Sequence, residues 1–475
     1  MNHDTSRRQF LATTGASLMA GALGLSSSAC SSSSAQQAAA AAQAPGGRLL
    51  LKGGCVLTLD AKLGDFDRAD VLIEGSRIVD VKPVIDVTAS TIDASNMIVM
   101  PGFVDTHRHM WQGALRNILP NGLLSDYSRD ITGAARTVFR PEDARVGDLV
   151  TALGALNAGV TTVLDWSHIG NSPEHTDAAI AGLREAGLRA VYAFGAGSGS
   201  AVRHPDDIRR LRKQQVPTSD PLLTLALAAG LDPSSWQVAR EVGARISVHV
   251  NGALSVPESA MGPDVTYIHC TQLDPSAWKR IAATGGHVSI ACPIEMEMGH
   301  GIPPIQESLD HGIRPSLSVD VETQMPGDFF TQMRAVFTLQ RMQALARARA
   351  ANGDAPTLLT TREVIEFATI AGARANGLDS RIGTLTPGKE ADVILLRRDL
   401  INVLPFNNAY GAVVQAMDTS NVDTVLVAGR VKKRGGQLVG VDLARIRQAA
   451  EASRDYIVAK AGWSRSVLGR ERPGH

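Results

Sequence analysis

The chain has 475 residues, of which 44% are hydrophobic and 20% charged, and its 47 basic side chains balance its 47 acidic ones, so the formal net charge is zero. This balance argues against a general nucleic-acid-binding protein, whose domain carries a basic excess to neutralise phosphates, and the apolar fraction excludes a disordered chain. Four cysteines in so long a chain exclude a disulfide framework.

The first residues have the pattern of an export signal and not of a folded element. Arg7 and Arg8 precede an apolar stretch over 10–25, and paired arginines before such a stretch indicate the twin-arginine (Tat) route. Cys30 resembles a lipoprotein processing site, although cleavage without lipidation stays an alternative, because Leu25 lies five residues before Cys30 where three is usual. We expect a signal peptide over 1–30 and a periplasmic, secreted or lipid-anchored protein.

Behind the signal, residues 31–46 are rich in Ser, Ala and Gln and predict a flexible tether. Two β-rich regions then flank the centre of the chain, and Gly75 with Ser76 marks a hairpin turn in the first. Their predicted strands are 48–59, 69–84, 392–396 and 422–431. We predict that 47–100 and 379–440 form one composite β-domain, followed by a C-terminal helix (443–461) and tail within 441–475.

Between the flanks, over 101–378, short apolar runs alternate with amphipathic stretches. The predicted strands are 98–105, 161–165, 188–194, 222–228, 245–250, 265–269, 287–291 and 314–320. Predicted helices between them include 141–158, 177–186, 233–242 and 275–283, and several begin with Pro or Asp-Pro and stop at Gly, as helices do. Apolar strands that are each followed by a helix indicate a parallel sheet buried on both faces. The predicted fold class is α/β: a (β/α)₈ TIM-like barrel with a small β-sandwich domain built from both flanks.

Candidate metal ligands lie at the ends of four predicted strands. His107 and His109 follow the first, and residues two apart in an extended chain face the same side. His249 ends the fifth strand, His269 the sixth and Asp320 the eighth. Each residue alone is more often a structural histidine or a loop acid, but all strand C-termini of a barrel converge on the face that carries the active site. Together they form a plausible zinc site with an open position for water.

The motifs around these residues resemble a known superfamily. Residues 101–109, PGFVDTHRH, resemble the first metal motif of the amidohydrolase superfamily, and 109–116, HMWQGALR, resemble its cytosine-deaminase and triazine-hydrolase (chlorohydrolase) branch. GVTTVLD at 159–165 and IGTLTPGKEADV at 382–393 support this, so that the resemblance extends over 48–429.

The resemblance implies a role for each candidate residue. It implies one divalent metal ion, zinc by default with iron or manganese as alternatives, held by His107, His109, His249 and Asp320. Asp320 would also take a proton from the attacking water, and His269 would contact that water or the substrate. Binuclear members commonly carry a bridging lysine on the fourth strand, and 222–228 contains none, so the expected site is mononuclear.

One departure from the superfamily bears on the reaction. In the deaminase branch a glutamate three residues after the fifth-strand histidine moves protons to the ring, whereas this chain has Gly252 there. Because glycine cannot carry a proton, ring deamination by the usual route is in question. Glu322, Glu295 or Glu297 could substitute. The favoured interpretation of Glu295 and Glu297 is a solvated loop carboxylate, and for Glu322 the two interpretations are balanced.

Other residues near the motifs have weaker support. Gln112 and Trp111 follow the metal motif and are candidate substrate contacts, with a packing role equally open for Trp111. Glu322, two residues after Asp320, is a third candidate substrate contact. We interpret His168 as structural and Cys270 as a buried structural thiol. His300 and His311 have no motif support.

The predicted function is a metal-dependent hydrolase of a carbon–nitrogen bond other than a peptide bond, in an amide, a cyclic amidine or amide, or a ring amino group. A dechlorinase or a decarboxylase on the same scaffold, and an exported metal-binding protein without turnover, are the alternatives. The expected partner is a small-molecule substrate. We expect no nucleic acid, membrane contact through a lipid at Cys30 only, and a homo-oligomer.

Overall fold

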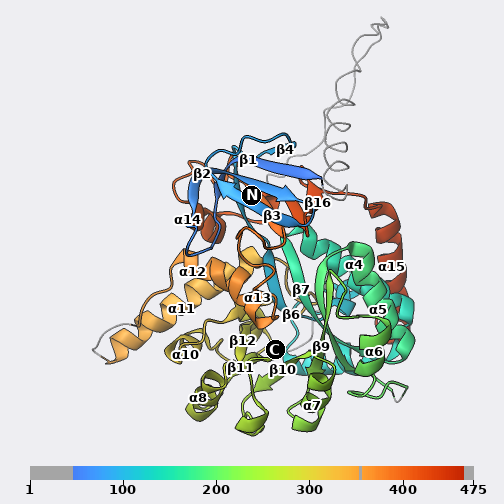
Figure 1. The fold of residues 1–475 in the computed structure, drawn as a ribbon. Helices are drawn as coiled ribbons and strands as arrows, with labels where there is room; N and C mark the ends of the chain where they lie inside the picture. The colour runs from blue at the N-terminus through green and yellow to red at the C-terminus, as the bar shows by residue number, and fades with distance from the viewer. Residues whose placement is uncertain (1–46, 200, 352–355, 465–475) are drawn as a thin grey trace, which may run out of the picture.

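The computed structural model describes residues 47–199, 201–351 and 356–464. The predicted signal peptide, its Cys30 and the tether lie outside the described residues. Two sheets organise the chain: one belongs to a β-domain at one end of the molecule, and the other belongs to a barrel surrounded by helices (Figure 1). Among the described residues, no helix is long and apolar enough to cross a membrane.

The barrel has eight strands, and each pairs in parallel with its neighbour in the chain, in the order β6 to β13. The strands are β6 (Phe103–Arg108), β7 (Val160–Gly170), β8 (Arg189–Ala196), β9 (Leu223–Ala229), β10 (Arg245–Asn251), β11 (Val265–Thr271), β12 (His287–Ile290) and β13 (Ser316–Leu317). The predicted (β/α)₈ barrel is therefore confirmed, with a last strand much shorter than the predicted 314–320.

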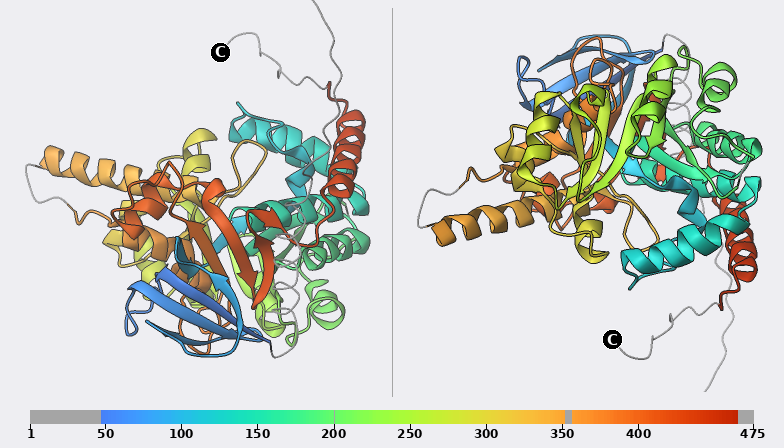
Figure 2. Two further views of the ribbon diagram at one scale, coloured as in Figure 1. Left: turned by 90° about the horizontal axis from the view of Figure 1, so that it is seen from above. Right: turned by 90° about the horizontal axis from the view of Figure 1, so that it is seen from below.

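Helices follow the strands and cover the outside of the barrel (Figure 2). They include α4 (Pro141–Asn157), α5 (Pro173–Ala186), α6 (Ile208–Gln214), α7 (Pro233–Glu241), α8 (Pro275–Ala283), α9 (Cys292–Glu297), α10 (Ile305–Asp310), α11 (Phe329–Ala351), α12 (Thr361–Glu366) and α13 (Gly372–Ala375). The predicted Asp-Pro helix starts are confirmed, because the side chains of Asp232 and Asp274 accept hydrogen bonds from backbone N–H groups in the first turns of α7 and α8.

The first predicted strand, 98–105, is in fact two strands in different sheets. β5 (Met97–Pro101) belongs to the β-domain, and β6 begins at Phe103 in the barrel. Gly102 lies between them, and a Cβ atom there would be 2.2 Å from side-chain atoms of Thr161. The close approach to β7 needs a residue without a side chain, and at this point the chain leaves one sheet for the other.

The β-domain draws strands from both flanks of the barrel, as predicted. Its strands are β1 (Arg48–Val56), β2 (Phe66–Glu74), β3 (Arg77–Lys82), β4 (Ser90–Asp93), β5, β14 (Val393–Arg397), β15 (Val422–Val427), β16 (Arg430–Arg434) and β17 (Gln437–Leu438). Leu49, Val71 and Leu395 belong to one apolar core that both flanks share. The predicted strand 422–431 turns at Gly429 and is the hairpin β15–β16.

Two contacts hold the β-domain and the C-terminal helix against the barrel. Arg189, which is 1% exposed, joins β8 to the β-domain through ion pairs with Asp392 at 2.7 Å and Glu390 at 2.5 Å. The predicted C-terminal helix is α15 (Leu443–Lys460), which lies along α4 (Figure 1) and donates a hydrogen bond of 2.6 Å from Ser453 Oγ to Asp143 Oδ1.

Candidate metal centre

At the joint where the first barrel strand, β6, meets the chain after the last strand, β13, the metal motif (101–109) lies beside Asp320. The backbone N–H of Asp320 donates to the His107 carbonyl at 3.0 Å, and the N–H of His109 donates to the Asp320 carbonyl at 2.8 Å. Asp320 has a φ of 68°, in the left-handed region that a residue with a side chain rarely adopts. Strained backbone of this kind is concentrated at functional sites, and here it directs the carboxylate toward the histidines.

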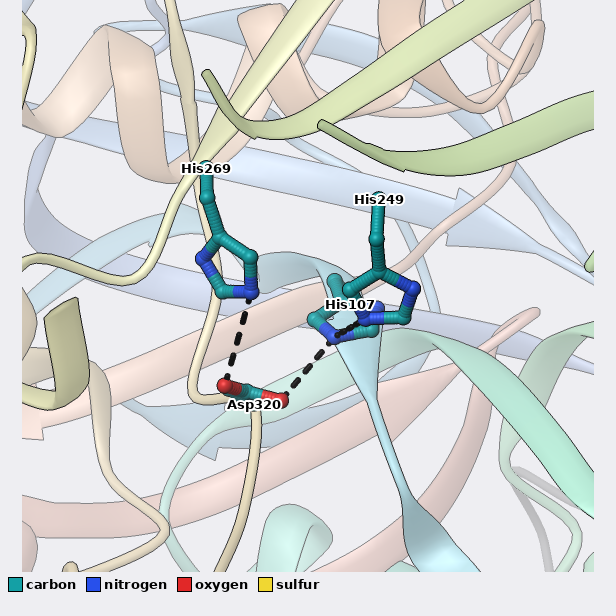
Figure 3. A group of neighbouring side chains, drawn as sticks. All are labelled: His107, His249, His269 and Asp320. Carbon is teal, nitrogen blue, oxygen red and sulfur yellow. Dashed lines mark hydrogen bonds and ion pairs between the residues drawn. The ribbon is translucent and has the colours of Figure 1, made fainter. Parts of the chain in front are cut away.

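Three histidines and Asp320 converge at this joint (Figure 3), with one nitrogen or oxygen atom of each within 4.8 Å of the others. His107 Nε2 lies 3.0 Å from Asp320 Oδ1 and 3.2 Å from His249 Nε2. His269 Nε2 lies 3.7 Å from Asp320 Oδ2. These residues come from β6, β10, β11 and the chain after β13, so the predicted convergence of strand ends holds for all four.

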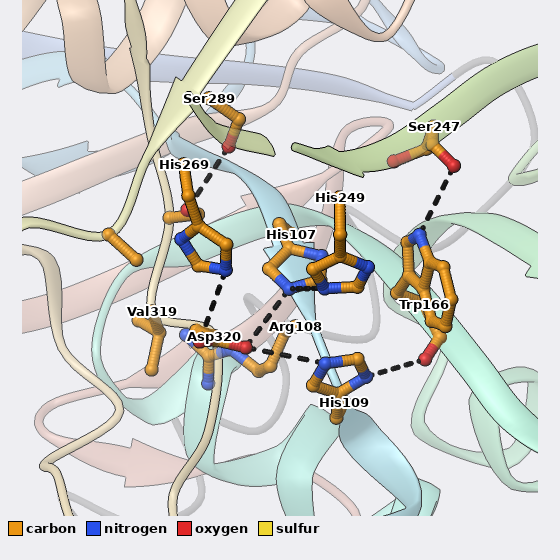
Figure 4. A network of polar contacts seen from close by, with 12 residues as sticks. His107, Arg108, His109, Trp166, Ser247, His249, His269, Ser289, Val319 and Asp320 are labelled. Atoms are coloured by element: carbon orange, nitrogen blue, oxygen red, sulfur yellow. Dashed lines mark hydrogen bonds and ion pairs between the residues drawn. The ribbon is translucent and has the colours of Figure 1, made fainter. Parts of the chain in front are cut away.

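His109 points to the same carboxylate from the other side (Figure 4). Its Nε2 lies 3.3 Å from Asp320 Oδ1, while its Nδ1 donates to the Trp166 carbonyl at 2.8 Å. Trp166 is held in turn by a hydrogen bond of 3.3 Å from its indole N–H to the Ser247 carbonyl. Because Nδ1 carries the hydrogen, Nε2 presents its lone pair to the site.

The electrostatics of the cluster suit a divalent cation. Burial lowers the pKa of His107, and it lowers the pKa of His109 and His249 well below the usual value, so these imidazoles are neutral and offer lone pairs. Burial would raise the pKa of Asp320, but the hydrogen bond and field of His107 hold it well below its usual value. Neutral imidazoles and a carboxylate that face one point are a donor set for zinc, iron or manganese.

The carboxylate of Glu295 orients His269, a role that the sequence did not predict. His269 Nδ1 donates to Glu295 Oε1 at 3.1 Å, and the Ala291 N–H donates to the same oxygen at 2.8 Å. The side chain of Glu295 is fully buried, so its interpretation as a solvated loop carboxylate was wrong. The short helix α9 turns it inward toward β11, whereas Glu297 is exposed as expected. The predicted contact of His269 Nε2 with the reaction centre is geometrically available.

Glu322 lies away from the reaction centre, which corrects its prediction as a substrate contact. Its Oε1 accepts from Arg108 Nη1 at 2.7 Å, and its Oε2 pairs with Arg116. Arg108 is fully buried and also binds Asp105 at 2.7 Å. With both oxygens held by arginines, Glu322 fastens the chain after β13 to β6 and has no free position for a substrate.

A cavity of about 220 Å³ opens over the cluster. It is lined by His109, Leu124, Tyr127, His249, Asn251, His269, Met298, His300, Asp320 and Val321. The sequence did not predict Tyr127 or His300 as wall residues, and the only signal for His300 was its position between two glycines, Gly299 and Gly301.

The two predicted substrate contacts next to the metal motif lie behind the cavity wall. Trp111 is fully buried, stacks edge-on against Phe139 with ring centroids 4.8 Å apart, and donates to His168 Nδ1 at 3.4 Å. Gln112 donates to the Tyr127 hydroxyl at 2.5 Å. Trp111 therefore has the packing role, Gln112 supports Tyr127, and His168 is structural as expected. Cys270 is a buried free thiol, also as expected.

A family comparison agrees with this arrangement. The model of the amidohydrolase family matches residues 98–432. The chain belongs to the amidohydrolase family. Membership of this family agrees with the enzyme class that the sequence predicted, an amidohydrolase.

Similar proteins cover nearly the same length. A 5'-deoxyadenosine deaminase of Methanothermobacter thermautotrophicus is 26% identical over 83% of this chain and 96% of its own. A 5-methylthioadenosine/S-adenosylhomocysteine deaminase of Symbiobacterium thermophilum is 25% identical over 85% and 98%. Among solved structures, a zinc-bound adenosine deaminase from Xanthomonas campestris has a TM-score of 0.74 at 20% identity, with 86% of this chain and 98% of that chain covered. The zinc complex of atrazine chlorohydrolase from Arthrobacter aurescens has a TM-score of 0.74 at 23% identity, with 86% and 100% covered. These structures confirm the fold.

Proposed function

We propose that this amidohydrolase uses one divalent metal ion to hydrolyse a carbon–nitrogen bond of a small, uncharged, nitrogen-containing ring or cyclic amide. The observation that carries the proposal is the buried convergence of imidazoles on Asp320 at the floor of a cavity of about 220 Å³. Among the described residues, the cavity is lined by no lysine or arginine, which favours a substrate without a carboxylate or phosphate there. Zinc in the two similar structures supports zinc as the ion.

Each residue of the site has a separate role in the proposed reaction. A divalent ion held by His107, His109, His249 and Asp320 would supply a water activated for attack at neutral pH. Asp320, a carboxylate under these conditions, accepts the proton of the attacking water. His269, held through Nδ1 by Glu295, presents Nε2 to the oxygen on which negative charge develops. A single ion is favoured because β9 carries no lysine to bridge two.

Dechlorination of an activated ring is a second candidate. Gly252 has a φ of 84° and no atom within 4 Å of the position where a Cβ would be, so this place holds no proton-carrying side chain. Chloride leaves a carbon without taking a proton, whereas an amine needs one. The likeness to an atrazine chlorohydrolase supports the same candidate.

A substrate panel with metal analysis tests these proposals. Purified enzyme is assayed for ammonia, amine and chloride release, and its bound metal is quantified. We expect C–N cleavage, about one metal ion per chain, and a loss of activity of more than about 100-fold on His249→Ala. His311→Ala, which changes the histidine directly after α10 and outside the cavity, is the matched control and should keep the activity. A protein that binds no metal, together with an Asp320→Asn variant as active as wild type, would overturn the proposal.

We also propose that the enzyme is exported by the Tat route. The twin arginines at positions 7 and 8 and the apolar stretch behind them support export, and Cys30 supports a lipid anchor.

A further inference from the structure

Cleavage of a carbon–nitrogen bond requires a proton for the nitrogen that leaves, and the carboxylates near the site do not provide it. Gly252 has no side chain, Glu322 is held by two arginines, and Glu297 is exposed. Glu295 is buried and bonded to His269. Asp320 receives the proton of the water, and a second group in the cavity wall can carry that proton on to the leaving nitrogen.

His300 has the features that this role needs. It is 7% exposed and lines the cavity, and both of its ring nitrogens are buried without a hydrogen-bond partner among the described residues. Its ring lies edge-on to that of His269, with centroids 4.6 Å apart. Buried polar atoms without partners carry a desolvation cost, and a bound substrate that hydrogen-bonds to them removes it.

The loop that carries His300 is fixed at both of its backbone polar groups. The His300 N–H donates to the Glu295 carbonyl at 3.0 Å, and its carbonyl accepts from Gln272 Nε2 at 2.9 Å. Gly299 and Gly301 have φ values of 77° and 130°, and a Cβ on Gly301 would lie 3.3 Å from the side chain of Gln272. The glycines allow the tight path that places His300 against the end of β11.

The other polar side chains in the wall are less suited to move a proton. His109 and His249 point to the Asp320 cluster. Asn251 is an amide, which carries no transferable proton, and burial raises the pKa of the Tyr127 hydroxyl, which makes it a weaker proton donor. Burial and the neighbouring His269 lower the pKa of His300 to about 4, so its ring is neutral, with a hydrogen on one nitrogen and a lone pair on the other. Such a ring can give a proton through one nitrogen while it takes one through the other.

We propose that His300 is a catalytic residue that hydrogen-bonds the leaving nitrogen of the substrate and relays a proton to it. The proposal rests on the hydrolytic function proposed above. Water adds its oxygen to the carbon and gives one proton to Asp320. The carbon–nitrogen bond breaks, the leaving nitrogen takes the proton of one His300 nitrogen, and the other nitrogen takes up, through water in the cavity, the proton that Asp320 releases. One water is consumed, and an amine and a hydroxy or keto product form.

The first arm of the test compares leaving groups. His300→Ala and His300→Gln are assayed on ring substrates that release either an alkylamine or chloride, and Met296→Ala, an exposed change on α9, is the control. For the amine substrate we expect kcat to fall about 100-fold in both variants. For the chloride substrate we expect less than about 5-fold, because chloride needs no proton. Added imidazole should restore part of the amine activity of His300→Ala, whose cavity has room for it.

The second arm measures binding from spectra recorded before the ligand is converted. Ligand-observed NMR gives the affinities of the metal-loaded enzyme for 4-aminopyrimidine and 4-methylpyrimidine, which differ only in the exocyclic nitrogen. Wild type should prefer the amine by about 2- to 10-fold, as one hydrogen bond provides, and His300→Ala should show no preference. The His300→Gln variant, which keeps an N–H donor, should retain part of it.

The outcomes separate the two proposals. Equal losses for amine and chloride substrates, or variants as active as wild type on both, would overturn the role of His300 and leave the hydrolytic function standing. A wild-type enzyme that cleaves no substrate would overturn the function, and the His300 role in catalysis with it. Unchanged metal content and melting temperature in the variants establish that the loss is catalytic.

Discussion

Two buried carboxyl groups beneath the metal centre predict how the stability of the enzyme depends on pH. Asp148 on α4 and Asp165 on β7 are both fully buried, and Asp165 Oδ1 accepts a hydrogen bond of 3.2 Å from the backbone of Met110. Burial raises the pKa of Asp165 to about 7, and burial together with the charge of Asp165 raises the pKa of Asp148 well above its usual value. The folded pair therefore holds a proton at neutral pH that the unfolded chain loses near pH 4.

The sign of the effect follows from which state binds the proton. Because the folded pKa values are raised, the folded state keeps protons that the unfolded state releases, so the stabilisation is present at low pH and is lost as the pH rises. For each proton that only the folded state keeps, the free energy of unfolding falls by about 1.4 kcal/mol per pH unit. This slope holds over the pH range in which the folded pair keeps a proton that the unfolded chain has lost. Asp148→Asn keeps the shape and an N–H donor toward Asp165 but removes this titration.

Thermal unfolding at pH 6, 7 and 8, at one scan rate and with metal bound, measures the difference. We expect wild type to lose stability more steeply than Asp148→Asn over this range, because the variant keeps only the titration of Asp165, and the variant should gain on wild type as the pH rises. Glu142→Gln removes an exposed carboxyl from the same helix and should follow wild type. Parallel pH profiles for wild type and Asp148→Asn would show that the pair does not hold the proton.

Three further predictions concern other parts of the chain. Arg189→Met should lower the free energy of unfolding by about 3 kcal/mol in chemical denaturation, because it leaves the carboxylates of Asp392 and Glu390 without their buried partner; a loss below about 1 kcal/mol would contradict this. Glu295→Gln should lower kcat by about 10- to 100-fold with metal content unchanged, because His269 loses the charged acceptor that orients it; an unchanged kcat would remove Glu295 from the mechanism. Replacement of Arg7 and Arg8 by lysines should retain the precursor in the cytoplasm in fractionation experiments, and unchanged export would exclude the Tat route.

The architecture could be predicted because each strand–helix unit of the barrel has recognisable signals in its own local sequence. An apolar run, an Asp-Pro helix start and a terminal glycine recur along the chain, and the caps at Asp232 and Asp274 form as the sequence indicates. The division of 98–105 could not be seen, because both halves of that run are apolar and buried. Which sheet each half joins depends on partners hundreds of residues away, such as β14 for Met100.

The metal ligands were accessible to sequence reasoning and the cavity wall was not, for a physical reason. A ligand at a strand end is placed by the barrel itself, so the chain positions of His249 and His269 suffice. A wall residue is placed by a loop, whose path depends on side-chain contacts. Glu295 points inward from the short helix α9 and bonds to His269 on β11. Tyr127, and not Gln112, lines the cavity, and Gln112 donates a hydrogen bond to it from behind the wall.

The contacts that close the barrel also form the metal centre in this enzyme. β13 has only two residues, and beyond them the last strand is joined to β6 by backbone hydrogen bonds between Asp320 and the residues His107 and His109. The residue between those histidines, Arg108, adds a buried ion pair to Glu322 across the same joint, and a second ion pair to Asp105 of its own strand holds its side chain in place. An ion bound by His107 and Asp320 would connect both sides of this joint and, by binding the folded state alone, would stabilise the closed barrel. The geometry that the chemistry needs at this point thus also completes the sheet, and a substitution that opens the joint removes both.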